Sequence, residues 1–264
     1  MSQLGTTVSA GVGLIEIHHV ARNNALTATM WRRLPAILED WEQEDEVLAV
    51  VLRGTGGTFS AGADIDDVPA ILFDDSREDL ISRATRRLAC FPKPTVAIIE
   101  GHCIGGGWEL AGACDLRVAT RSAVFGVTPA RLGVVYPVSG VRRLVGLVGP
   151  GVARQLLLTA ELVPAERAYR WGMVTTLAED SAIDEIAAGV VRTLLSRSQL
   201  SVRAAKEMVM LHDDPEAQRA AHDRWAAASL LSGELEEGRR AFLERRAPLF
   251  PWRGTPAAAA PGKL

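Results

Sequence analysis

The most informative stretch of this 264-residue chain reads Thr95-Val-Ala-Ile-Ile-Glu-Gly-His-Cys-Ile-Gly-Gly-Gly-Trp-Glu-Leu-Ala-Gly-Ala-Cys-Asp115. The apolar run at residues 95–99 predicts a buried strand, and a glycine-rich turn then leads into a helix with Glu109 in its first turn. Glycines let a ligand approach the backbone closely, and a helix N-terminus directs unpaired N–H groups at the turn. The pattern suits an oxygen that gains negative charge beside one acid or base. A run of three glycines on its own is equally compatible with a plain strand–helix turn.

A second glycine-containing turn comes earlier in the chain. It reads Gly54-Thr-Gly-Gly-Thr-Phe-Ser-Ala-Gly-Ala-Asp-Ile65 and follows an apolar run at residues 48–53, which predicts another buried strand. Two strand–turn units built from small residues can each present a backbone N–H to the same ligand. We therefore expect two donors to converge on one oxyanion.

Three segments carry a recognisable motif set: Phe59-Ser-Ala-Gly-Ala-Asp-Ile65, Phe91-Pro-Lys-Pro-Thr-Val-Ala97 and Glu100-Gly-His-Cys-Ile-Gly-Gly-Gly-Trp-Glu-Leu110. In order and spacing they resemble the crotonase (enoyl-CoA hydratase/isomerase) family. The similarity covers nearly the whole chain. It begins at Arg22-Asn-Asn-Ala-Leu26, continues through Leu132-Gly133 and Arg143-Leu144, where the family has a matching loop, and ends in a closing helix at residues 237–250.

The resemblance implies an α/β fold, with a crotonase-like spiral of β-β-α units at residues 1–195. A helical C-terminal region with a disordered tail follows at residues 196–264. The family uses this region for trimer formation. Residue patterns predict strands and helices consistent with this division. Strands are expected at residues 12–18, 48–53, 95–99, 116–119 and 123–126, and helices at 27–43, 77–90, 184–196, 200–211, 215–231 and 234–246. In the first helix, Trp31, Leu34, Ile37, Leu38 and Trp41 have the spacing of a core face.

By resemblance, the N–H groups of Ala63 and Gly106 hold the acyl oxygen of a coenzyme A thioester, and Glu109 is the acid or base. The implied substrate-binding positions are Arg22, Ala25, Ala61, Asp64, Ile65, Trp108 and Ala130. The segment at residues 68–76 is expected to line the acyl pocket. Coenzyme A enters as part of the substrate, and no tightly bound cofactor or metal is expected. The expected assembly is a homotrimer or a dimer of trimers. Fatty acid metabolism is the implied setting.

The exact reaction stays open because the chain departs from the hydratase pattern. Family hydratases use two glutamates to hold the attacking water, and at the second position this chain has Ala130, which exchanges no protons. Tyr136 stands where many relatives have proline, and its segment is similar to methylmalonyl-CoA decarboxylase, whose tyrosine contacts the substrate carboxylate. That enzyme has a histidine where Ala63 stands here. Hydratase or lyase activity leads narrowly, ahead of decarboxylation, double-bond isomerisation by Glu109 alone, and non-catalytic acyl-CoA binding.

Other features exclude competing classes. A net charge of −3 and a pI near 6.0 give no basic footprint for nucleic acid. The chain shows neither a secretory signal nor a membrane-spanning run, so we expect a cytoplasmic protein without membrane contact. The three cysteines lack metal-ligand spacing, and Cys114 is expected in the core. Asp66 lies where relatives often have a lysine for coenzyme A phosphates, so that contact is expected from Arg22 or the closing helix.

Overall fold

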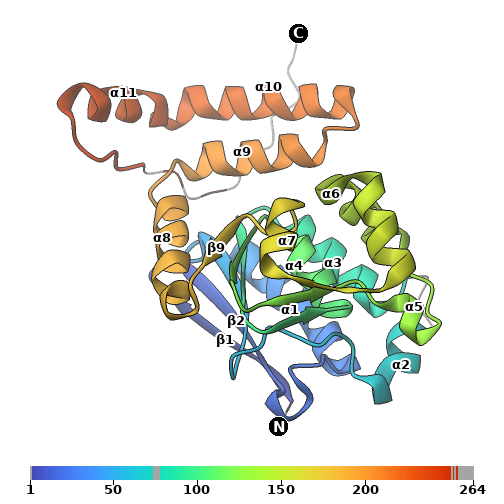
Figure 1. Cartoon of the computed structure of the whole chain (residues 1–264). Coiled ribbons are helices and arrows are strands. Elements are labelled where there is room, and N and C mark those ends of the chain that lie inside the picture. The colour runs from blue at the N-terminus through green and yellow to red at the C-terminus, as the bar shows by residue number, and fades with distance from the viewer. Residues whose placement is uncertain (1, 74–77, 251, 253, 255–264) are drawn as a thin grey trace.

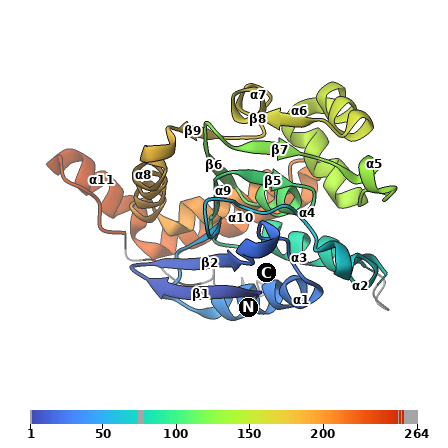
Figure 2. The same cartoon turned by 60° about the horizontal axis from the view of Figure 1, so that its bottom comes forward.

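The computed structural model describes residues 2–73, 78–250, 252 and 254, which form two sheets (Figures 1 and 2). The larger sheet has the order β1 (Gln3–Ser9), β2 (Val12–His18), β3 (Ala49–Gly54), β4 (Thr95–Ile99), β6 (Leu116–Thr120) and β9 (Thr176–Ala178). Its β1 and β2 are antiparallel, and its other neighbours are parallel. The smaller sheet joins β5 (His102–Ile104), β7 (Val124–Gly126) and β8 (Leu162–Pro164).

The chain alternates between the two sheets as it advances. β4 lies in the larger sheet and β5 in the smaller one, and the same step recurs from β6 to β7. The helix α4 (Gly106–Ala113) follows β5, which completes a β-β-α unit. This alternation is the spiral that the motifs predicted. A bridge between Ser60 and Cys103 joins the earlier glycine-containing turn to β5, so both turns lie side by side.

Helices cover both faces of the larger sheet. On one side α1 (Ala28–Gln43) packs against α3 (Leu80–Ala89), and α3 packs against α4. On the other side α8 (Ile183–Leu195) packs on β3, β4 and β6 with its own apolar cluster. The helices α9 (Gln199–Met210), α10 (Pro215–Ser232) and α11 (Glu234–Glu244) form a separate layer at the top of Figure 1.

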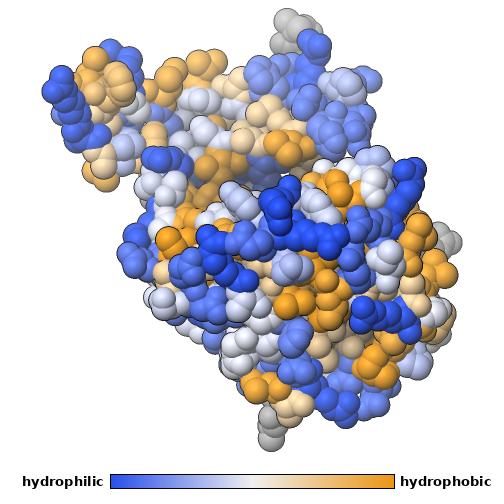
Figure 3. All heavy atoms as spheres, in the orientation of Figure 1, coloured by the Kyte–Doolittle hydropathy of each residue, from blue (hydrophilic) through white to orange (hydrophobic). Residues whose placement is uncertain are grey.

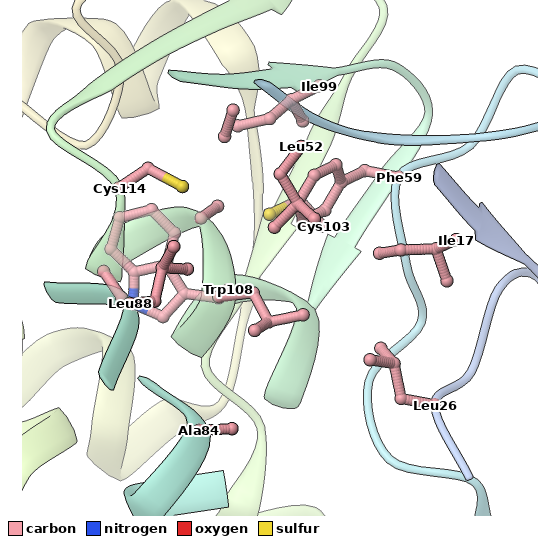
Figure 4. Packing of buried hydrophobic residues seen from close by; sticks show 14 of the residues in the cluster. Ile17, Leu26, Leu52, Phe59, Ala84, Leu88, Ile99, Cys103, Trp108 and Cys114 are labelled. Carbon is pink, nitrogen blue, oxygen red and sulfur yellow. The ribbon is translucent and has the colours of Figure 1, made fainter. Parts of the chain in front are cut away.

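Capping side chains and the buried core together determine where α1 and α3 begin and end. Thr27 caps α1 by accepting from the Met30 amide, and the five predicted apolar residues of this helix are all buried. Asp79 caps α3 in the same way through the Ser82 amide, and Cys90 ends this helix just before Phe91-Pro92. Figure 4 shows the packing around Trp108, and Cys114 is buried there as predicted.

Several predicted boundaries need correction. The helix expected from residue 77 begins at Leu80, where the Asp79 cap sets its start. The segment around Arg143, predicted as a loop, belongs to α6 (Val138–Thr159), which has non-helical backbone at Gly149, with φ 74°, before Pro150. The pattern also missed β1, β5, β8, β9 and the short helices α2 (Val68–Leu72), α5 (Pro129–Leu132) and α7 (Ala165–Arg170).

The four C-terminal helices agree with their predicted ranges to within two residues at each end. The proposed division at residues 195 and 196 falls between α8 and α9 and stays a prediction. The predicted disordered tail from Pro256 lies outside the described residues. Among the described helices, none is both long enough and apolar enough to cross a bilayer.

Candidate active site

The glycine-rich turn after β5 brings backbone close to backbone. Gly105 has a φ of 55°, which favours glycine, and its amide donates to Gly126 O at 2.8 Å. A Cβ added to Gly107 would come within 2.5 Å of Ser60 O. Only glycine at this position lets the earlier loop pack directly on the start of α4.

Two backbone N–H groups meet where these loops touch. A Cβ added to Gly106 would lie 3.2 Å from Ala63 N, and one added to Gly62 would lie 3.1 Å from Gly106 N. A backbone bridge joins Leu26 to this loop through Gly62 O and Asp64 N, so it does not use the Ala63 N–H between them. Gly106 is the first residue of α4, so its N–H has no partner within the helix. Within the described residues, the N–H groups of Ala63 and Gly106 therefore have no hydrogen-bond acceptor, so both are available to a ligand.

Asn24 holds the loop that carries Ala63. Its buried side-chain amide donates to Thr55 O and Thr58 O, both at 2.8 Å, and its side-chain oxygen accepts from His19 N at 2.8 Å. Ser60 Oγ donates to Asn24 O, which adds a third bond between Asn24 and this loop. These bonds fix the path of the backbone from residue 55 to the Ala63 amide.

The two turns open into one cavity of about 660 Å³, which includes its solvent-exposed mouth. Backbone from both glycine turns forms one part of its wall, and Glu109 is the acidic residue among its lining side chains. The remaining wall is largely apolar, which suits an acyl group. It is lined by Ile65, Val68, Leu72, Ile81, Thr128, Pro129, Leu132, Val134, Tyr136 and Pro137.

Glu109 is 3% exposed and forms an ion pair with Arg143, whose Nη1 donates to Oε2 at 2.8 Å. Burial raises the pKa of this carboxyl above its ordinary value, while Tyr136 and Arg143 act in the opposite direction. A raised pKa lies closer to neutral pH, and a carboxyl group with such a pKa is suited to accept and return a proton.

Tyr136 packs beside this carboxylate. Its hydroxyl and Glu109 Oε1 are both buried and interact with each other, and neither has another hydrogen-bond partner in the described part of the chain. Burial, together with the negative charge of Glu109, raises the pKa of Tyr136 well above its ordinary value. The phenol is therefore protonated at neutral pH and has a proton to donate.

Six predicted site residues line the cavity together. They are Ala61, Ala63, Ile65, Gly106, Glu109 and Tyr136. Val68 and Leu72, from a segment predicted to line the pocket, are also on the wall, while its residues 74–76 lie outside the described residues.

Five other predicted positions do not line this cavity. Trp108 is in the core against Phe125, because it projects from α4 in a different direction from Glu109. Ala25 and Asp64 are buried beneath the loop, where Asp64 pairs with His19 at 3.7 Å. Arg22 is exposed and pairs with Asp66 at 3.0 Å. Ala130 is exposed on α5, and its neighbour Pro129 occupies the wall instead.

Sequence reasoning also missed a residue that contacts Glu109. Arg143 comes from α6, 34 residues further along the chain, and nothing local in the sequence links the two side chains. The signal that was available is the adjacent pair Arg142-Arg143 next to Leu144 in a matched motif. Of these two arginines, Arg143 faces the site, whereas Arg142 is exposed.

In a comparison with known protein families, residues 7–253 match the family model described as "Enoyl-CoA hydratase/isomerase". The chain belongs to the enoyl-CoA hydratase/isomerase family. It is 30% identical over 240 residues to a short-chain-enoyl-CoA hydratase of Clostridium acetobutylicum, and the matched residues cover 89% of this chain and 92% of that protein. It is 33% identical over 249 residues to a putative enoyl-CoA hydratase of Thermus thermophilus, with 90% and 97% covered.

Solved structures of the family share the fold. One enoyl-CoA hydratase/isomerase family member superposes with a TM-score of 0.93 at 36% identity, covering 97% of this chain and 98% of the other. The enoyl-CoA hydratase of Mycobacterium tuberculosis H37Rv gives a TM-score of 0.85 at 28% identity, with 95% and 99% covered. The α/β spiral with its C-terminal helices is therefore the architecture of this enoyl-CoA hydratase/isomerase family.

Proposed function

We propose that the protein is an acyl-CoA thioester enzyme that stabilises a thioester enolate between two backbone amides. The observation that carries this proposal is the adjacency of two acceptor-free N–H groups, on Ala63 and Gly106, at a cavity that also contains Glu109. Donors aimed at a developing oxyanion are worth roughly 3–4 kcal/mol each. Family membership supports a coenzyme A thioester as the ligand.

In this proposal Glu109 moves the proton. As a carboxylate it takes a proton from the α carbon or from water, and as a carboxylic acid it returns one. The thioester oxygen meanwhile carries the negative charge of the enolate and accepts from both amides. The apolar walls hold the acyl chain and exclude bulk water, which strengthens these electrostatic interactions.

Hydration or the reverse elimination is our leading reaction, supported by relatives named as enoyl-CoA hydratases. The described residues of the cavity wall offer one carboxylate, however, so water would be activated with less help than in a site with two. Isomerisation of a double bond needs a single base and is the second candidate. Decarboxylation is the third, favoured by the protonated Tyr136 phenol beside Glu109.

The phosphates of coenzyme A must bind outside the apolar cavity. Arg22 is our candidate for this contact, although it is paired with Asp66. Both side chains are more than half exposed, and pairs of this kind are worth about 0–1 kcal/mol, so an incoming phosphate can replace the carboxylate. The assembly that we propose is a trimer or a dimer of trimers through the C-terminal helices.

A panel of thioesters tests the proposal. Crotonyl-CoA, a 3-enoyl-CoA and methylmalonyl-CoA are each incubated with the wild-type protein and with Glu109→Gln, and products are identified. We expect turnover of at least one thioester and a loss of roughly 10²–10⁴-fold in the variant. Binding of all three without turnover would replace the enzyme with a non-catalytic acyl-CoA binder. Equal turnover by the wild type and Glu109→Gln would remove Glu109 from the mechanism.

A further inference from the structure

Two residues of α6 contact the Glu109 carboxylate from different sides. Arg143 Nη1 donates to Oε2, and the Arg143 side chain is only 16% exposed. Gly140, three residues earlier on α6, is buried, and a Cβ added to it would overlap Oε1. Both carboxylate oxygens therefore lie against a helix that is not the one carrying Glu109.

A second glycine makes room for the arginine. Gly112 lies three residues after Glu109 on α4, and a Cβ added there would come 3.3 Å from Arg143 Cδ and 3.5 Å from the Trp108 ring. The arginine stem therefore passes over α4 where that helix has no side chain. Glycines at both places allow α4 and α6 to bring the two charges together.

Among the described residues, three charged or titratable groups face Glu109. Arg143 is on α6, Tyr136 precedes it, and Asp79 caps α3. Burial and Asp79 raise the pKa of Glu109, and Tyr136 and Arg143 lower it. Arg143 is the cation in this set, so it balances a carboxylate that burial would otherwise neutralise.

We propose that Arg143 and Gly140 are positioning residues that hold the Glu109 carboxylate ionised and in a fixed orientation at the cavity wall. This inference rests on the proposed function, in which Glu109 is the acid or base. It assigns control of the reactive group to the first turns of α6. The helix α4 fixes the Cα atom of Glu109, and α6 determines where the two carboxylate oxygens of this residue lie.

The first test compares Arg143→Met and Arg143→Lys with Arg142→Met as the matched control. Arg142 is the adjacent arginine, 77% exposed, and its nearest carboxylate, on Asp213, is 3.9 Å away. In Arg143→Met the acidic limb of the kcat/KM profile should move to higher pH, because the cation that lowers the pKa of Glu109 is gone. At neutral pH kcat should fall roughly 10²-fold. Arg143→Lys should recover part of both effects, and Arg142→Met should match the wild type.

Gly140→Ala tests the steric half of the proposal without removing a charge. The added methyl group must displace the Glu109 carboxylate, so kcat should fall roughly 10²-fold while KM changes little. This variant also decides the question if Arg143→Met fails to fold. A Gly140→Ala enzyme with wild-type kcat would overturn the claim that α6 positions the oxygens.

A measurement without turnover separates this proposal from the proposed function. Carbon-13 NMR of labelled glutamate carboxyls, with Glu109 assigned by its absence in Glu109→Gln, follows its titration directly. The Glu109 resonance should titrate at higher pH in Arg143→Met than in the wild type. An unmoved titration and an unmoved acidic limb in a folded variant would overturn the role of Arg143. If Glu109→Gln is inactive at the same time, the proposed function survives that result.

Discussion

At the scale of single residues, Glu109 is the one carboxylate among the described residues that line the cavity, and Pro129 is a lining position where a second one can be added. This residue is the first of α5 and lines the cavity, whereas Ala130 is exposed and does not line it. The first position of a helix suits a carboxylate, because the unpaired N–H groups there favour negative charge. The two neighbouring positions thus form a matched pair for an added glutamate.

We predict that Pro129→Glu raises hydration of crotonyl-CoA by roughly tenfold or more, because a second carboxylate shares the activation of water. Ala130→Glu adds the same charge on the same helix but away from the wall, so it should leave the rate unchanged. The assay follows loss of enoyl-thioester absorbance. A rate gain in Ala130→Glu alone would mean that the cavity wall is wrongly assigned.

The sequence was sufficient to predict which residues of the two glycine turns and of the first turn of α4 lie at one cavity. Ala63, Gly106 and Glu109 were all predicted, and all line one cavity. Trp108 and Ala130 could not be placed in this way, because the direction of a side chain depends on how its helix packs. The ion-pair partner of Glu109 could not be predicted for a related reason, because Arg143 lies on a helix that the sequence predicted as a loop.

At the scale of elements, the loop from residue 55 to 64 depends on Asn24. Two carbonyl oxygens, of Thr55 and Thr58, receive their hydrogen bonds from this one side chain. Asn24 also has a φ of 57°, a left-handed conformation that asparagine tolerates better than most residues. The Asn-Asn-Ala motif near the front of the chain therefore shapes a loop more than 30 residues away.

We predict that Asn24→Asp lowers the free energy of unfolding by about 2 kcal/mol or more. The aspartate keeps the acceptor for the His19 amide but loses both donors, which leaves two carbonyl oxygens without partners. Asn23→Asp is the control, because Asn23 is exposed and has a similar φ of 50°. Urea denaturation measures both variants. Equal stability of the two would contradict the role of Asn24.

Element boundaries were predictable where a pattern is long and uninterrupted. The helices α9 and α10 agree closely with expectation because they run for 12 and 18 residues without an interior glycine or proline, and Ser198 and Asp214 cap their starts. Strands of three residues, such as β8 and β9, are too short to show a period. The helix α6 was hidden by Pro137 before it and by Gly149-Pro150 inside it.

At the scale of the whole molecule, the helical layer of α9, α10 and α11 exposes large apolar side chains. Figure 3 shows apolar residues in orange over this layer at the top of the molecule. Leu231 is 89% exposed and Phe242 is 83% exposed, and others nearby in sequence share this exposure. They include Leu230, Leu235 and Leu243. Apolar surface of this kind marks a contact with another protein surface, which supports the trimer that we propose.

We predict a particle of about three or six times the 28.3 kDa of one chain in light scattering after size exclusion. The double substitution Leu231→Asp with Phe242→Asp should reduce the mass, because charges would be buried without partners in the interface. Circular dichroism checks that the variant keeps its helices. A wild-type monomer, or a variant of unchanged mass, would contradict a trimer built on these helices.

We propose that the amides of Ala63 and Gly106 bind one acyl oxygen, and a crystal structure with an unreactive thioester would show this contact. A β-ketoacyl-CoA is suitable, because its enolised form resembles the thioester enolate. We expect the thioester oxygen at roughly 2.7–3.1 Å from both nitrogens, with the α carbon beside Glu109. A thioester oxygen that contacts neither amide, with the acyl group outside the cavity, would contradict it.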